Sequence, residues 1–197
     1  MTTVYFVRHA QPNYENHNDQ LRELTARGMA DRKKVTEFLN HQNITFVISS
    51  PYKRAIDTVK EFADLHNLQI ELNEDFRERT VGSEWIENFD AFARRQWHDF
   101  SYKLSGGESL EEVQKRNISA LQSVLNSHSG ENIVIGTHGT ALSTIIHHYD
   151  SSFGYEDFCE IKNIMPWIVR FVFDDQANFI SIHYDKENDI GHLRIKN

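Results

Sequence analysis

The chain opens with the stretch MTTVYFVRHAQPNYEN, residues 1–16. The interpretation of the fold depends on the residues at which the apolar part of this stretch ends. Residues 4–7 are β-branched or aromatic, which is typical of a buried strand. The run leads directly into Arg8 and His9. Two polar residues often mark the place where a strand reaches solvent, and that interpretation gives neither of them a chemical role. The rest of the sequence decides between that interpretation and a functional site.

Length and composition predict one globular domain that spans residues 1–197, with 39% hydrophobic and 12% aromatic residues. No apolar run approaches the length of a membrane span, and the first residues enter a strand without a basic, leader-like segment. We therefore expect a cytoplasmic protein with no membrane partner. A single cysteine, Cys159, cannot form an internal disulfide, which agrees with a reducing compartment.

The charge of the chain argues against nucleic acid as a partner. The formal net charge is −8 and the sequence has no basic cluster that could neutralise a phosphate backbone. The 11 histidines raise the question of a metal, but none of them has the spacing of a ligand set, and His147 and His148 diverge by about 100° on a helix. We expect neither a metal nor another cofactor.

Strand-like runs alternate with segments of helical period. The runs lie at residues 4–7, 45–48 and 132–135; helical patterns lie at residues 25–42, after Pro51, after Gly107 and after Gly139. Ser109 and Glu112 form a capping-box pattern at the start of the third. Two further runs, 167–173 and 179–184, indicate an antiparallel hairpin. The sequence predicts an α/β three-layer sandwich with a mostly parallel central sheet flanked by helices.

Residues 83–106 interrupt this alternation and predict a helical insertion. Its apolar side chains recur at close to helical spacing, at Ile86, Phe89, Ala93, Trp97 and Phe100. They either pack into the core or form a cap over a pocket. In the second case Arg94, Arg95 and Lys103 are available to meet an anion.

Polar residues follow each of the three strand-like runs, where ligands bind in open α/β sheets. Arg8 and His9 follow the first. After the second, Ser50 is expected to cap a helix that begins at Pro51, so that Arg54 lies in a first turn that favours anions. His138 follows the third, and the next residue, Gly139, lets the backbone approach a ligand closely. Two arginines and two histidines at one edge predict a phosphate-sized anion site.

These residues belong to motifs through which the chain resembles the histidine phosphatase superfamily, with its phosphoglycerate-mutase-like fold. The matching elements are Arg8-His9-Ala10 for the Arg-His-Gly signature, Leu-Thr-x-x-Gly at residues 24–28, the Ser-Ser-Pro element at residues 49–58, an acidic element at Glu78, Gly-Glu-Ser at residues 107–109, and a second histidine at His138. They follow the family order over nearly the whole chain.

The chain departs from the family pattern at two positions. Ala10 stands where glycine is usual, and Glu15 stands where the family often has an asparagine that contacts phosphate. A carboxylate beside phosphate would repel it. Either Asn13 or Asn16 takes that place, so that both are candidate substrate-binding residues, or Glu15 points away from the site.

The resemblance and the chemistry of phosphoryl transfer imply the same roles. A neutral imidazole at His9 is expected to attack phosphorus, with its other nitrogen held by a backbone carbonyl. Arg8, Arg54 and His138 are expected to surround the phosphate oxygens. Glu78 is expected to protonate the leaving oxygen and later to activate water.

Three functions compete on this basis. The first is a metal-independent phosphatase that hydrolyses small phosphomonoesters through a phosphohistidine on His9. The second is a cofactor-dependent phosphoglycerate mutase, which would share the pocket. The third is a non-catalytic module that binds phosphorylated ligands. The short insertion with few cations favours the phosphatase, since a mutase must close its site against water and clamp a carboxylate.

Overall fold

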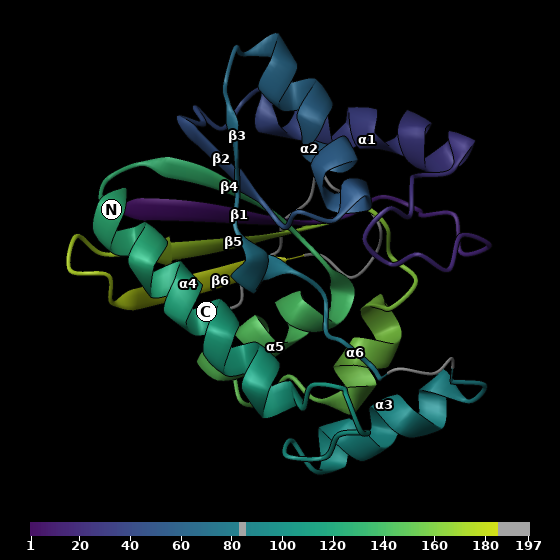
Figure 1. Ribbon diagram of the computed structural model, residues 1–197. Helices are drawn as coiled ribbons and strands as arrows, with labels where there is room; N and C mark the ends of the chain where they lie inside the picture. Colours follow the sequence, from purple (N-terminus) through teal and green to yellow (C-terminus); the bar gives the residue numbers. More distant parts are fainter. Residues whose placement is uncertain (83–85, 185–197) are drawn as a thin grey trace.

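The computed structural model describes residues 1–82 and 86–184 of the chain. In this part of the chain six strands form one sheet, in the order β3-β2-β4-β1-β5-β6 (Figure 1). Strands β1 to β4 are parallel, and β5 and β6 are antiparallel to their neighbours. The strands are Thr2–Arg8 (β1), Phe46–Ser49 (β2), Ile70–Leu72 (β3), Asn132–Thr137 (β4), Trp167–Phe173 (β5) and Phe179–Tyr184 (β6). The predicted sheet and its C-terminal hairpin are confirmed.

Helices cover both faces of the sheet, which confirms the three layers (Figure 1). Helices α1 and α2 pack on one face, and α4 and α5 pack on the other. Helices α3 and α6 contact each other beside α5. The bounds are Ala26–Leu39 (α1), Lys53–Leu65 (α2), Phe89–His98 (α3), Leu110–Ser127 (α4), Gly139–Tyr149 (α5) and Tyr155–Ile161 (α6), with a short 3₁₀ helix at Glu74–Phe76 (η1).

Strand β1 is buried on both of its faces. Val4 and Phe6 pack among side chains of α4 and α5, whereas Tyr5 and Val7 pack among those of α1 and α2. Burying one such side chain stabilises the fold by about 1.5–3 kcal/mol. Hydrogen bonds to β4 on one side and β5 on the other hold the strand in register. The end of β1 is therefore a rigid place from which to present a side chain.

The helix starts follow local capping chemistry, with one correction. Ser109 and Glu112 form the predicted capping box of α4. The helix expected to begin at Pro51 begins instead at Lys53, with Tyr52 as its N-cap. Ser50 does not cap it: the Ser50 hydroxyl lies 2.7 Å from Nε2 of His138 and accepts from the backbone N–H of Tyr52 at 3.3 Å. Arg54 still lies in the first turn.

The described part of the insertion, residues 86–106, contains α3. One side of α3 belongs to the core, where Trp97 packs against Phe153 and Phe158 with ring centres 6.0 and 5.8 Å apart. The helix is also tied to α6, because Lys162 Nζ lies 2.9 Å from Asp90 Oδ1. The remaining residues of the insertion, 83–85, lie outside the described residues.

The three cations that a cap could offer to an anion each contact a neighbouring side chain. The guanidinium of Arg94 lies 5.7 Å from the centre of the Tyr155 ring, and that of Arg95 lies 3.8 Å from the centre of the Tyr102 ring. Lys103 pairs with Glu112. The three contacts lie within the insertion or join it to α6 and to the start of α4.

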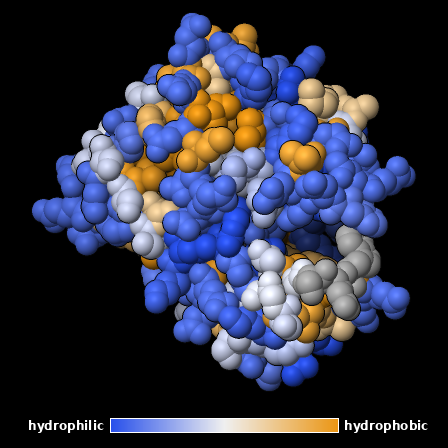
Figure 2. All heavy atoms as spheres, in the orientation of Figure 1, coloured by the Kyte–Doolittle hydropathy of each residue, from blue (hydrophilic) through white to orange (hydrophobic). Residues whose placement is uncertain are grey.

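The surface in the space-filling view is mostly hydrophilic (Figure 2). Hydrophobic residues gather in its upper part, around β3 and the end of α2, where Leu72 and Leu65 are exposed. On the right of the same view the surface is hollowed beyond the carboxyl ends of the strands (Figure 2). No helix in the described residues is long and apolar enough to cross a bilayer.

Candidate active site

His9 directly follows β1, and its ring has a defined tautomer. Nδ1 lies 2.8 Å from the carbonyl oxygen of Ala10, and a carbonyl can only accept, so Nδ1 carries the proton. The lone pair is therefore on Nε2. The backbone N–H of His9 donates to the carbonyl of Thr137 at 3.1 Å, which ties the residue to the end of β4. Only 5% of His9 is exposed.

The surroundings of His9 keep its ring uncharged. Burial holds the pKa of His9 well below its ordinary value, and the positive charges of Arg54 and Arg8 lower it further. A neutral imidazole with a free lone pair is a nucleophile, and it carries no charge that would have to be lost before attack.

His138 follows β4 and lies beside His9. Their ring centres are 5.3 Å apart, with the rings inclined at 61°. Its Nε2 contacts the Ser50 hydroxyl, while its buried Nδ1 has no hydrogen-bond partner in the described part of the chain. Burial, with the charge of Arg54 next, also holds the pKa of His138 well below its ordinary value.

Arg8 is held by the end of α6. Nη1 donates to the carbonyls of Ile161 and Ile164 at 2.8 and 3.2 Å, and Nη2 donates to that of Lys162 at 2.9 Å. Gly139 gives the guanidinium room, because a Cβ there would lie 3.0 Å from its Cζ and Nη2. Gly139, expected to let the backbone approach a ligand, thus lets the Arg8 guanidinium approach the first turn of α5.

Arg54 lies near the start of α2 and is 2% exposed. Its Nη2 lies 3.0 Å from Oδ1 of Asp19, and its Nη1 donates to the backbone carbonyl of Asp19. The guanidinium is also 5.1 Å from the centre of the Tyr52 ring. Arg54 is thus a buried cation whose carboxylate partner comes from a loop, and an incoming anion can bind the same guanidinium.

Glu78 reaches the N-terminus of α5, directly after His138. Its Oε2 accepts from the backbone N–H of Thr140 at 3.0 Å, and its Oε1 accepts from those of Ala141 and Arg79 at 3.1 and 2.8 Å. The amides of Thr140 and Ala141, in the first turn of α5, have no partner within the helix, and the helix dipole favours a carboxylate there. The carboxylate of Glu78 thus lies at the start of α5, the same helix start that the Arg8 guanidinium approaches at Gly139.

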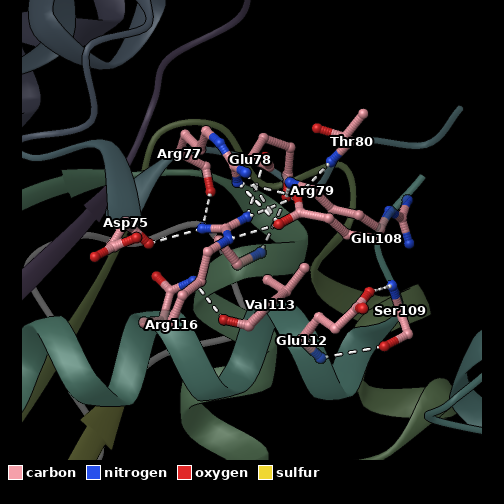
Figure 3. A network of polar contacts seen from close by, with 12 residues as sticks. Asp75, Arg77, Glu78, Arg79, Thr80, Glu108, Ser109, Glu112, Val113 and Arg116 are labelled. Carbon is pink, nitrogen blue, oxygen red and sulfur yellow. Dashed lines mark hydrogen bonds and ion pairs between the residues drawn. The ribbon is translucent and has the colours of Figure 1, made fainter. Parts of the chain in front are cut away.

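A network of polar contacts fixes the segment that carries Glu78 (Figure 3). Glu108 is its centre: its carboxylate accepts from Arg77 at 3.0–3.1 Å, from Arg116 at 2.9 and 3.2 Å, and from the backbone N–H of Thr80 at 2.9 Å. Burial alone would raise the pKa of Glu108, but the hydrogen bonds from Arg116 and Thr80 outweigh it and lower the pKa to about 2.

Arg116 links this centre to the backbone around Glu78. It donates to the carbonyls of Asp75, Arg77 and Glu78, at 2.7, 2.9 and 3.3 Å (Figure 3). Glu108 belongs to the Gly-Glu-Ser motif, but its place at the centre of this network was not predicted, and Arg77 and Arg116 were missed. Arg116 lies on α4, far in sequence from Glu78, and no local pattern reveals that its side chain reaches back to that segment.

The asparagines of the loop after β1 have a partner of their own. Asn13 and Asn16 both donate through Nδ2 to the carboxylate of Glu23, each at 2.7 Å. Glu15 is exposed, and its backbone N–H donates to Oδ1 of Asn13 at 3.1 Å. The structure therefore gathers His9, His138, Arg8, Arg54 and Glu78 around the ends of β1 and β4, whereas the two asparagine amides are engaged within their own loop.

The described residues contain no group of three or more His, Cys, Asp or Glu side chains that could hold a metal ion. Arg8 and Arg54 supply positive charge beside His9.

We predict that replacing Glu108 destabilises the fold. Glu108→Gln leaves Arg77 and Arg116 without their carboxylate, and we expect the free energy of unfolding to fall by about 2–4 kcal/mol. Glu111→Gln is the control, because Glu111 is an exposed carboxylate in the first turn of α4, the helix that carries Arg116, and contributes about 0.3–1 kcal/mol. Urea unfolding near neutral pH measures both, and similar losses would contradict the central place of Glu108.

We also predict that the buried histidines make stability depend on pH. Their pKa values are lower in the folded chain than in the unfolded chain, so the unfolded chain binds more protons below the ordinary pKa of 6.5. Their contribution is complete above pH 6.5 and is lost as the pH falls toward the folded-state pKa. As the pH falls below 6.5 toward the folded-state pKa, His9→Gln should reduce the slope of unfolding free energy against pH, by up to about 1.4 kcal/mol per pH unit where the unfolded histidine is almost fully protonated. Equal slopes in denaturant titrations of the two proteins would refute this.

Known proteins share this sequence pattern and this fold. The chain is 28% identical over 153 residues to phosphoserine phosphatase 1 of Hydrogenobacter thermophilus, and this match covers 70% of the chain and 71% of that protein. It is 29% identical over 159 residues to phosphoglycerate mutase-like protein 4 of Arabidopsis thaliana, and this match covers 72% of the chain and 68% of that protein.

Among solved structures, Bacillus stearothermophilus YhfR has the same fold, with a TM-score of 0.77 at 23% identity over 96% of this chain and 98% of that one. The sequence profile of the histidine phosphatase superfamily (branch 1) matches residues 4–180, a span that includes most of β1 and the site residues His9, Arg54, Glu78 and His138. The chain therefore belongs to the histidine phosphatase superfamily.

Proposed function

We propose that this protein is a phosphatase that hydrolyses small phosphomonoesters without a metal ion, through a phosphohistidine on His9. The observation that carries the proposal is the hydrogen bond from His9 Nδ1 to the Ala10 carbonyl, which leaves the Nε2 lone pair free beside two arginines. Membership of the superfamily supports it, and so does the similarity to a protein named phosphoserine phosphatase.

The residues perform the reaction in two steps. In the first, Nε2 of His9 forms a bond to phosphorus, the bond from phosphorus to the ester oxygen breaks, and Glu78 donates a proton to that oxygen. Arg8, Arg54 and His138 stabilise the charge on the other phosphate oxygens. In the second, water attacks phosphorus, Glu78 takes a proton from the water, and the bond to Nε2 breaks.

The insertion favours hydrolysis over the mutase reaction. A mutase has to hold the carboxylate of phosphoglycerate and keep water away from the phosphohistidine. Arg94, Arg95 and Lys103 are engaged with Tyr155, Tyr102 and Glu112, so the insertion does not gather them into a clamp. We propose that residues 1–197 form one domain in which the insertion caps the phosphate site.

The same proposal extends to where the enzyme works. The formal charge of −8 disfavours nucleic acid as a partner and directs attention to small metabolites. We place it in the cytoplasm, where the single Cys159 would stay reduced.

A panel of phosphorylated metabolites, assayed for phosphate release and isomerisation together, tests hydrolysis against the mutase reaction. We expect phosphate release to exceed mutase turnover on 3-phosphoglycerate by a wide margin, with no large stimulation by 2,3-bisphosphoglycerate. Rapid interconversion of 2- and 3-phosphoglycerate with little phosphate released would show a mutase. Binding of phosphorylated ligands without turnover would show a binding module.

The covalent intermediate is testable on His9. A reaction with labelled substrate, quenched by denaturation, should contain an acid-labile and base-stable phosphoprotein, and His9→Ala should abolish both the label and turnover. His41→Ala is the control, because His41 is an exposed histidine outside the site. Label that survives in the His9→Ala protein would overturn the assignment.

The role of Glu78 is testable through the leaving group. Glu78→Gln should slow hydrolysis of alkyl phosphates by about a hundred- to ten-thousand-fold, the usual effect of removing a positioned acid. Aryl phosphates with good leaving groups need less protonation and should lose less in the phosphorylation step. Glu74→Gln, on an exposed neighbour, should leave both rates unchanged. Equal losses for both substrates in single-turnover experiments would mean that Glu78 only positions other groups.

A further inference from the structure

Two guanidinium groups converge on one carboxylate oxygen at the edge of the candidate site. Oδ1 of Asp19 lies 3.0 Å from Nη2 of Arg54 and 3.0 Å from Nη1 of Arg22. Arg54 comes from α2, and Arg22 comes from the loop between β1 and α1. No motif and no position after a strand predicted a role for Arg22. Its side chain nevertheless contacts the same carboxylate as Arg54, which belongs to the phosphate site.

Arg22 is placed to act on the site and is not a freely moving surface cation. Its side chain is 11% exposed, its Nε donates to the carbonyl of Asn16 at 2.8 Å, and its guanidinium lies 5.6 Å from the centre of the Tyr14 ring. Its charge is also among those that lower the pKa of His9 and of Arg54. The field of Arg22 thus reaches the nucleophile.

The terminal nitrogens of Arg8 and the amides of the loop after β1 are already engaged. Both terminal nitrogens of Arg8 donate to carbonyls at the end of α6. The amide groups of Asn13 and Asn16 donate to Glu23. In the loop after β1, Arg22 is the cation whose present partner is an exchangeable carboxylate that Arg54 also contacts.

We propose that Arg22 is a further phosphate-binding residue, and that the Asp19 carboxylate occupies, in the free site, the position that a phosphate oxygen takes between Arg22 and Arg54. This inference rests on the proposed phosphatase function and adds to it a specific pair of side chains. A phosphate dianion carries more charge than a carboxylate and offers three oxygens, so it can replace Asp19 between the two guanidinium groups.

The loop backbone allows this exchange without large movement. The backbone carbonyl of Gln20 accepts from the N–H of Lys53 at 2.9 Å, and that of Asp19 accepts from Arg54. These bonds hold the loop against the start of α2 while the Asp19 side chain, 42% exposed, turns away. Until then Asp19 keeps the two arginines oriented and offsets their repulsion.

The test measures binding of inorganic phosphate by calorimetry, separately from turnover. Arg22→Gln should weaken phosphate binding about 10- to 100-fold, as expected for a lost charge-assisted hydrogen bond, and raise KM more than it lowers kcat. Arg22→Lys keeps the charge and should recover part of the loss. Arg27→Gln is the matched control, because Arg27 is an exposed arginine paired with Asp31 on α1, and it should leave binding unchanged.

Asp19→Asn should change the affinity for phosphate in the opposite direction to Arg22→Gln. Removing the competing charge should tighten phosphate binding about 3- to 10-fold, and the gain should shrink when Arg22 is also replaced. Weaker binding in Asp19→Asn would show that Asp19 is a fixed brace and would overturn the exchange.

The outcomes separate this inference from the proposed function. If Arg54→Gln loses phosphate binding while Arg22→Gln does not, the inference on Arg22 is wrong and the phosphatase proposal stands. Equal losses in Arg22→Gln and Arg22→Lys, together with a lower melting temperature in both, would mean that Arg22 only holds the loop, and would also refute it. Wild-type protein that neither binds phosphate nor releases it from any ester would refute the proposed function itself.

Discussion

Charged groups buried at one edge of the sheet need partners, and the structure around the site is arranged to supply them. A buried guanidinium without a partner would cost several kcal/mol. Arg8 therefore meets the carbonyls at the end of α6, and Arg54 meets Asp19. The carboxylate of Glu78 meets the amides of α5. The loop after β1, α6 and the start of α5 are each positioned by one of these pairings.

Burial and the same concentration of charge determine the chemistry of the histidines. Burial opposes protonation of His9 and His138, and the positive charges of Arg54 and Arg8 add to this effect, so both rings stay neutral in the folded chain and the cost appears as a loss of stability at lower pH. The Ala10 carbonyl selects which nitrogen of His9 keeps the proton. Under the proposed function, a site that attracts a phosphate dianion would thus also keep its nucleophile in the reactive form.

Sequence patterns predicted the parts of the fold that depend on local regularity. The runs at β1, β2, β4 and the hairpin, and the capping box of α4, follow from neighbouring residues. Strand β3 has only three residues at an exposed edge, and α6 has seven, so neither produces a clear periodicity. Arg8, His9, Arg54 and His138 were predicted because they follow strand-like runs, and Glu78 was predicted from the family resemblance; their partners were not predicted. Arg8 contacts residues more than 150 positions away, and Ser50 contacts His138 from the end of the neighbouring strand, which no local pattern encodes.

Helix α6 connects the end of β1 to the insertion. Its end holds Arg8 through backbone carbonyls, and Lys162 joins it to Asp90 of α3 in the insertion. If the insertion contacts the leaving group, as the proposed function has it, a substrate that displaces α3 would also displace the support of Arg8. Affinity for the phosphoryl group and preference for the leaving group would then change together.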